Sequence, residues 1–144
     1  MCRGIHLITI IVIFVKLQVS DDIEVVIYNT NSEMRILDNG VLHVIYSDGI
    51  VLEIEDIKEL QVQFDLLDPK PRKVLQHLGR YSTMSSDCRK FAAEHSPDLD
   101  GVAYVIHGLA QRLFIRFYVK MWKRDKPTKV FETVPEALDW LDEL

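Results

Sequence analysis

Short runs of β-branched and other apolar residues alternate with turn residues in the first third of the chain, and this pattern predicts strands. The runs lie at residues 23–28, 34–37, 41–46 and 50–52. Asn39-Gly40 separates the second run from the third and is a strong hairpin signal, because type I′ turns need positive φ at both central residues. A leading β-hairpin is therefore expected.

Beyond residue 53 the apolar spacing alternates between helical stretches and short buried runs. Helices are predicted at about residues 54–67, 86–95, 109–122 and 134–144, and strands at 73–78, 101–106 and 128–131. Ser85 and Thr133 are placed to cap the second and the last of these helices. The order predicts an α/β fold, with a mixed, mostly parallel sheet of about four to six strands and about four helices packed on it.

The predicted helix at 109–122 carries a long apolar stripe. Leu109, Leu113, Phe117 and Met121 recur every four residues, with further aromatic residues beside them. Such a face is expected to be buried against the sheet or against a partner. A homodimer is one arrangement that would cover it.

Four basic residues also recur at intervals of four along the same helix. They are Arg112, Arg116, Lys120 and Arg124. This spacing places them on one face, where they could contact an acidic partner or an anionic lipid surface. The alternative interpretation, which we favour at this point, is a solvated face opposite the apolar one, neutralised by nearby acids such as Glu132.

The N-terminal 32 residues form a separate question. Residues 7–15 (LITIIVIFV) are strongly apolar but are too few to span a bilayer as a helix. The run fits an additional β-strand, a crude membrane anchor or signal, or an extension that lies outside the true domain. We therefore divide the chain into an N-terminal extension, 1–32, and a domain, 33–144.

Composition narrows the function classes. A length of 144 residues suits one domain, and a net charge of −5 argues against a general nucleic-acid-binding protein. The two cysteines stand apart, so neither a disulfide nor a zinc site is expected, and a cytoplasmic location is the default.

No catalytic, metal-binding or phosphate-binding motif occurs. His107 follows a predicted strand, where α/β proteins place ligands, but alone it is interpreted as a loop hydrogen-bonding residue. Neither an enzyme nor a cofactor is predicted.

Two stretches resemble a known family. Residues 34–43 (MRILDNGVLH) look like the opening, and residues 117–141 look like the closing signature, of uncharacterised, mainly Bacteroidetes, proteins with a STAS domain, the SpoIIAA-like or anti-sigma-factor-antagonist-like fold. In STAS antagonists a serine at the start of the second helix is phosphorylated. The resemblance places Ser85 and Ser86 there, although the usual preceding aspartate and following glycine are missing. A plain N-cap is the favoured interpretation of these serines.

The sequence as a whole therefore predicts a non-catalytic STAS-like regulatory or interaction module. Its expected contact surface is the basic helix together with a loop formed by Tyr81, Ser82, Thr83 and Met84. The partner would be a protein or a small ligand, which the sequence does not identify. The alternative is a peripheral membrane or lipid-associated protein that uses the N-terminal apolar run and the basic helix face.

Overall fold

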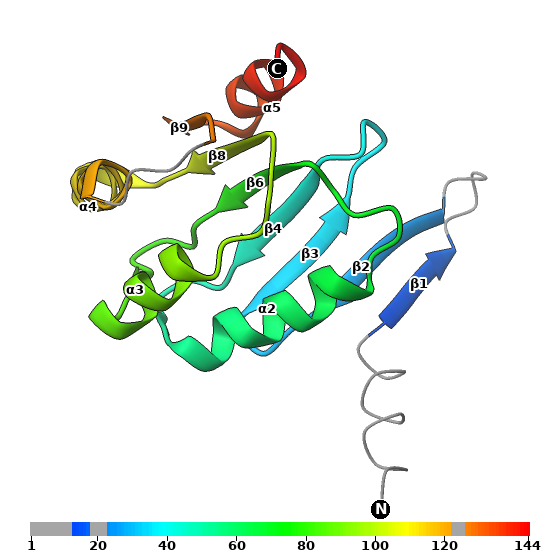
Figure 1. Ribbon diagram of the computed structural model, residues 1–144, viewed down its shortest axis with the longest axis horizontal. Helices are drawn as coiled ribbons and strands as arrows, with labels where there is room; N and C mark the ends of the chain where they lie inside the picture. The colour runs from blue at the N-terminus through cyan, green and yellow to red at the C-terminus, as the bar shows by residue number, and fades with distance from the viewer. Residues whose placement is uncertain (1–12, 18–22, 122–125) are drawn as a thin grey trace, which may run out of the picture.

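One mixed β-sheet with helices on both of its faces forms the fold (Figure 1). The computed structural model describes residues 13–17, 23–121 and 126–144, with side chains from residue 25 onwards. The predicted residues 7–12 of the apolar run, and Arg124 of the basic stripe, lie outside this described part.

The sheet has the strand order β1-β2-β3-β4-β6-β8-β9. The strands are β1 (Ile13–Leu17), β2 (Ile23–Tyr28), β3 (Ser32–Ile36), β4 (Leu42–Tyr46), β6 (Lys73–His77), β8 (Gly101–Val105) and β9 (Thr128–Phe131). β1 to β4 pair antiparallel, whereas β4, β6, β8 and β9 pair parallel. A second, small sheet pairs β5 (Val51–Leu52) with β7 (Thr83–Met84) in parallel.

Four helices connect or follow the parallel strands. They are α2 (Ile54–Leu66), α3 (Ser86–Glu94), α4 (Gly108–Met121) and α5 (Val134–Asp142). α2, α3 and α4 each join two parallel strands, which must be linked by a crossover rather than by a tight turn. Thr133 Oγ1 accepts a hydrogen bond from the backbone of Glu136, so it caps α5. The mixed α/β sheet with a leading hairpin and four helices is confirmed.

The strand register divides the side chains between two faces. Val44, Gln76 and Tyr104 lie level on one face, and their neighbours His43 and Leu75 lie level on the other, because alternate residues of a strand point to opposite sides. The first face carries the larger apolar core, which includes side chains from α2, α3 and α4. α5 packs on the second face over a smaller core. In Figure 1, α2 and α3 accordingly lie across the sheet from α5.

The β3–β4 hairpin forms where the sequence predicts it, but its turn differs from type I′. Gly40 has φ of 81°, whereas Asn39 does not have positive φ. Gly40 N donates to Leu37 O at 2.8 Å, and Leu37 N donates to Val41 O at 2.9 Å. These bonds describe a three-residue loop that ends in a left-handed glycine. Asn39 instead uses its side chain, which accepts from Val41 N at 3.1 Å.

One strand forms where the sequence predicts a loop. Thr83–Met84 forms β7, because its backbone pairs with β5. β2 forms at the predicted residues 23–28, and residues 13–15 of the apolar run lie in β1, which corresponds to the additional strand that was one of the three alternatives for this run. Both strands are hydrogen-bonded in register to their neighbours. With β1 the sheet has seven strands, one more than the upper end of the predicted range.

The apolar stripe of α4 departs from the expectation of burial. Leu109, Leu113, Phe117 and Met121 are all exposed, and the buried residues of α4 are Gln111, Ile115 and Tyr118. The apolar row is therefore real but does not pack on the sheet, so of the two expected ways to bury it only contact with a partner stays a prediction. The buried residues of α4, among them Ile115 and Tyr118, hold the helix on the sheet.

We expect Gly79→Ala to lower the free energy of unfolding by about 3 kcal/mol, because the added Cβ would overlap the backbone carbonyl of Ser47. Gly40→Ala is the control. Its Cβ meets nothing within 4 Å, so only the positive φ opposes it, at a cost of about 1 kcal/mol. Urea unfolding of both variants measures the difference, and equal losses would contradict the close approach at Gly79.

Candidate functional site

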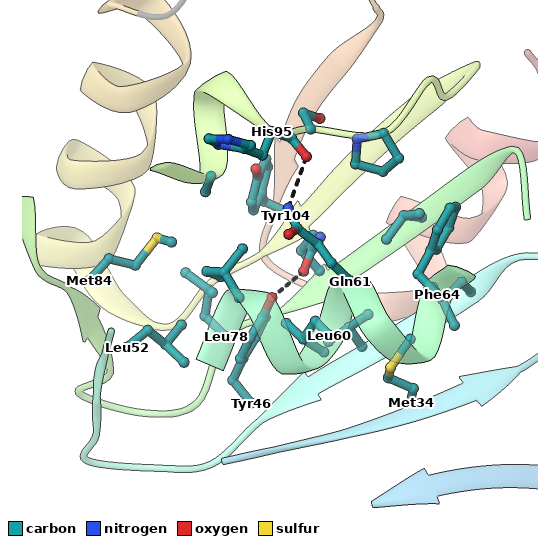
Figure 2. Close-up of a pocket in the computed structure, with 18 of the residues that line it drawn as sticks. Met34, Tyr46, Leu52, Leu60, Gln61, Phe64, Leu78, Met84, His95 and Tyr104 are labelled. Atoms are coloured by element: carbon teal, nitrogen blue, oxygen red, sulfur yellow. Dashed lines mark hydrogen bonds between the residues drawn. The ribbon is translucent and has the colours of Figure 1, made fainter. Parts of the chain in front are cut away.

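A cavity of about 440 Å³ lies between the larger core face of the sheet and the helices that cover it. Its walls come from β3, β4, β6 and β8 of the main sheet, from the ends of β5 and β7, and from α2, α3 and α4; Figure 2 shows many of these side chains. Most of the lining side chains are apolar: Met34, Leu42, Val44, Leu52, Ile57, Leu60, Phe64, Val74, Leu78, Met84, Ala92, Pro97 and Ile115. The volume falls within the usual size range of small-molecule sites, roughly 300–1,000 Å³.

A polar pair stands on the cavity floor. The hydroxyl of Tyr46 donates a hydrogen bond to Oε1 of Gln76 at 2.7 Å (Figure 2). Burial raises the pKa of Tyr46 above its ordinary value, and the nearby Tyr104 adds to the effect. Tyr46 therefore stays neutral at physiological pH and acts as a hydrogen-bonding group rather than as a base.

Polar residues gather at one end of the cavity, between α2 and the end of α3. Gln61 Nε2 donates to the backbone carbonyl of His95 at 2.9 Å, so this bond joins α2 to the end of α3 beside the lining (Figure 2). Asp65, Ser96 and Pro97 also line this end. The cavity thus has an apolar body and a polar end.

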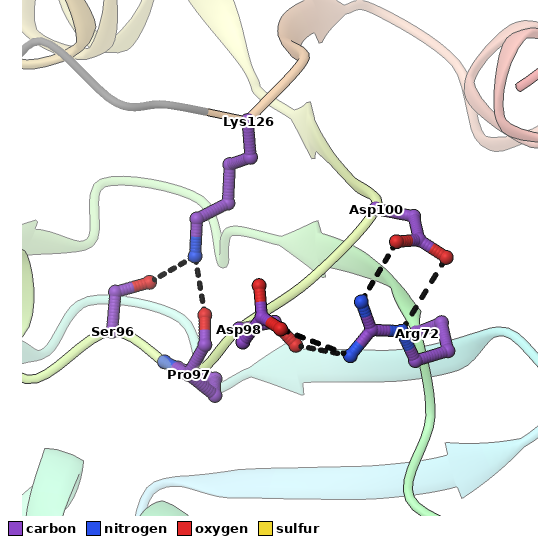
Figure 3. Close-up of polar contacts among 6 residues, drawn as sticks. All are labelled: Arg72, Ser96, Pro97, Asp98, Asp100 and Lys126. Atoms are coloured by element: carbon purple, nitrogen blue, oxygen red, sulfur yellow. Dashed lines mark hydrogen bonds and ion pairs between the residues drawn. The ribbon is translucent and has the colours of Figure 1, made fainter.

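Two cations hold the loop that forms this end (Figure 3). Arg72 binds Asp100 through two nitrogens, at 2.8 and 3.4 Å, and also binds the backbone and carboxylate of Asp98. The hydrogen bond from Arg72 lowers the pKa of Asp100. Lys126 donates to Ser96 Oγ at 2.8 Å and to the carbonyl of Pro97. The loop between α3 and β8 is therefore fixed from two different elements.

Ser85 and Ser86 lie at the start of α3. Ser85 is the N-cap, and its hydroxyl accepts from Cys88 N at 3.2 Å. Ser86 Oγ accepts from Arg89 Nη2 at 3.0 Å. Burial raises the pKa of the Cys88 thiol to about 12, so this cysteine is not an activated nucleophile. Ser85 thus acts as the N-cap that the sequence favours, and phosphorylation of either serine stays the less favoured of the two predictions.

The predicted contact loop is only partly at the surface. Tyr81 is 88% exposed and has φ of 60°, and Thr83 is exposed as well. Ser82 is buried, with its hydroxyl donating to Ser47 O at 2.5 Å, and Met84 lines the cavity. Ser82 and Met84 therefore belong to the interior rather than to a contact surface.

A buried glutamine fixes the same loop against α4. Gln111 Nε2 donates to the carbonyls of Gly79 and Ser82 at 2.7 and 3.1 Å, while its Oε1 accepts from His107 N at 2.8 Å. The Gln111 side chain is buried, and an unpaired amide there would be costly. Sequence reasoning missed Gln111, because a lone glutamine on a helix carries no signal of its partners.

The basic residues of α4 divide into two sets. Arg112 forms an ion pair with Glu132, the acid named as a candidate neutraliser. Arg116 and Lys120 are exposed. They lie beside the exposed apolar residues of α4 rather than opposite them, so the expected segregation into a basic face and a buried apolar face is wrong.

Three histidines form a row on the second face of the sheet. The rings of His43 and His77 stack with centroids 5.6 Å apart, and the ring of His107 lies 5.4 Å from that of His77. His43 Nε2 and His77 Nδ1 are buried and have no hydrogen-bond partner among the described residues. The sequence separates these residues by 30 or more positions, so only the strand register reveals the row.

Burial favours the neutral form of two of these side chains, His43 and His77. It lowers the pKa of His43 to about 4, with contributions from His77 and Arg35 that Glu33 opposes. Burial likewise lowers the pKa of His77, with a contribution from His107 that Asp48 opposes. Within the part of the chain that the structure describes, no cluster of three or more His, Cys, Asp or Glu side chains is arranged to hold a metal ion.

Comparison with models of protein families shows to which family the chain belongs. The family described as "Domain of unknown function (DUF7793)" matches residues 34–144. The chain belongs to this family. A search of curated proteins finds no match. Among solved structures, the chain is similar to an uncharacterised protein of the DUF3478 family from Shewanella loihica PV-4, which has a SpoIIAA-like fold. The two share 18% identity with a TM-score of 0.49, over 90% of this chain and 91% of that one.

The family match begins within β3, so β1 and β2 precede the matched region. Residues 13–17, 23–121 and 126–144 contain no helix long and apolar enough to cross a membrane. The family name assigns no activity, so the function has to be argued from the site itself.

The histidine row predicts a pH dependence of stability. Because the pKa of His43 is about 4 in the folded chain and about 6.5 when unfolded, the unfolded chain takes up its proton first as pH falls. The contribution of neutral His43 to the free energy of unfolding is therefore fully present above about pH 6.5 and is lost as the pH falls from there towards about 4. We expect His43 to account for about 1–2 kcal/mol of this loss, after allowance for partial solvent screening.

Urea unfolding of the wild type and of His43→Gln between pH 7.5 and 5 measures this effect. Gln cannot titrate, so the variant should lose less stability over the range. His95→Gln, on the other side of the sheet, is the control and should retain the wild-type slope. An unchanged slope in His43→Gln would show that His43 is not held neutral by the fold.

Proposed function

We propose that the protein is a non-catalytic module that binds one small, largely apolar molecule in the cavity beneath α2 and α3. The observation that carries this proposal is the cavity itself, with its apolar walls and its polar end. Tyr46 and Gln76 would orient a single polar group of the ligand, since both side chains reach the lining.

The size and lining of the cavity support the binding of a ligand. Its volume of about 440 Å³ lies within the range of small-molecule sites, roughly 300–1,000 Å³. Because the lining is mostly apolar, water in the cavity finds few hydrogen-bond partners, and an apolar molecule would displace it favourably.

The side chains in and beside the lining support binding rather than catalysis. Tyr46, in the lining, is held neutral, and Cys88, on α3 outside the lining, has a thiol whose pKa is raised by burial. Ser85 accepts a hydrogen bond from Cys88 N and is engaged as the cap of α3. The ligand we expect has an apolar body and one hydrogen-bonding group, and is of the size of two to four fused rings or a short acyl chain.

Ala92 offers a direct way to fill the cavity. It lies on α3 and lines the cavity, whereas its neighbour Ala93 is absent from the lining. Ala92→Phe should occupy the space that a ligand needs. Ala93→Phe adds the same side chain to the same helix and is the matched control.

The test uses 1-aminoanthracene, a fluorescent apolar molecule with one amine. At about 0.5 kcal/mol for each of its roughly 15 heavy atoms, the wild type should bind it with a Kd on the order of 1–10 μM. We expect a stoichiometry of one, a loss of at least tenfold in Ala92→Phe, and little change in Ala93→Phe. Both variants should keep a cooperative thermal transition.

Two results would contradict the proposal. One is the absence of saturable binding to the folded wild type. The other is equal binding by Ala92→Phe, which would place the probe on an exposed apolar surface instead of in the cavity.

A further inference from the structure

The outer face of α4 is apolar and uncovered by any described residue. Leu109, Leu113, Phe117 and Met121 are 69%, 59%, 65% and 61% exposed. Large side chains exposed in a contiguous row on one helix are uncommon unless the row contacts something. The helix stands at the side of the molecule (Figure 1), so its outer face is open to a partner.

Within α4 as the structure describes it, Gly108–Met121, the charged side chains beside this row are all positive. Arg116 and Lys120 are exposed next to the apolar residues, and the sequence of α4 (GLAQRLFIRFYVKM) contains no Asp or Glu. Glu132 is paired with Arg112, one turn away from Arg116. The local surface is therefore basic and apolar, although the whole chain carries a net charge of −5.

A second copy of the chain fits this surface poorly. Two α4 helices packed through their apolar rows would bring Arg116 and Lys120 of one copy near the same cations of the other. Like charges brought together at an interface are unfavourable. The occupant must therefore offer apolar contact together with negative charge.

The geometry of the apolar row fits the surface of a lipid bilayer better than it fits a partner helix. Residues four apart advance about 40° around the helix axis, so the row sweeps through about 120° from Leu109 to Met121. A partner helix running alongside needs the narrower seam of a seven-residue repeat. A bilayer interface accepts a broad apolar face flanked by Lys and Arg.

We propose that α4 docks on anionic lipid bilayers, with its apolar row entering the interface and with Arg116 and Lys120 contacting lipid phosphates. The acidic residues elsewhere in the chain oppose this only weakly, since charges beyond about 10 Å are screened at physiological salt. This docking surface is separate from the cavity, so it does not depend on the proposed ligand.

Co-sedimentation of the full chain with vesicles tests the proposal. Vesicles of phosphatidylcholine with about a third phosphatidylglycerol should bind the wild type at ~0.1 M salt, whereas pure phosphatidylcholine should bind it at least tenfold more weakly. Replacing two apolar residues together, Leu113→Ser with Phe117→Ser, should reduce binding to the anionic vesicles at least tenfold.

Two further variants make the result specific to α4. Arg116→Gln with Lys120→Gln should abolish the preference for phosphatidylglycerol. Val62→Ser, which alters a side chain 60% exposed on α2, should bind like the wild type. All of the substitutions are at exposed positions, and thermal melts confirm that each variant is folded.

The opposite results would overturn the proposal. Wild-type binding that survives the loss of Leu113 and Phe117 would show that another segment, such as residues 7–15, contacts the lipid. Failure of the folded wild type to bind anionic vesicles would leave an acidic amphipathic helix of another protein as the occupant of α4.

Discussion

The parallel register of β4, β6 and β8 is the constraint on which the rest of the structure depends. It places Val44, Gln76 and Tyr104 level on one face, and His43 and Leu75 level on the other. A shift of one residue would exchange the two faces of the shifted strand. The register therefore decides which side chains form the cavity floor, which form the small core under α5, and which form the histidine row.

Apolar side chains of α2, α3 and α4 pack on the first face, and polar contacts near the helix ends add to this packing around the cavity. At one end, Arg72 and Lys126 fix the loop after α3, and Gln61 ties that loop to α2. At the other, Gln111 fixes the start of α4 against the loop that leads to β7. Polar anchors of this kind let α2 and α3 stand over the sheet without packing apolar side chains across the whole gap.

Much of the fold could be predicted from the sequence, because each element carries a local signal. Pro69 ends α2, Thr133 caps α5, and the run at 128–131 becomes β9 with the predicted bounds. The mistakes arose where the outcome depends on distant partners. The stripe on α4 was predicted to be buried against the sheet or a partner, since periodicity identifies an apolar row but does not show that other residues, such as Ile115 and Tyr118, already hold the helix on the sheet.

The candidate site was much less predictable than the fold. A cavity is a volume left between elements, and its lining comes from residues scattered between Met34 and Tyr118. The histidine row has the same origin, because only the pairing of β4 with β6 brings His43 beside His77. No local motif encodes either feature. The spacing of the apolar and basic residues of α4, by contrast, could be recognised from the sequence. Their exposure on the outer side of the helix could not.

Isotope-filtered NMR of the full chain with bound 1-aminoanthracene tests the central claim most directly, because it locates the molecule by distance. The account predicts nuclear Overhauser effects from the aromatic protons of the probe to the methyl groups of Leu60, Leu78 and Met84, which line the cavity. Contacts confined to the methyl groups of Leu113 and Met121 on the outer face of α4 would contradict it, and would mean that the cavity does not take up an apolar ligand.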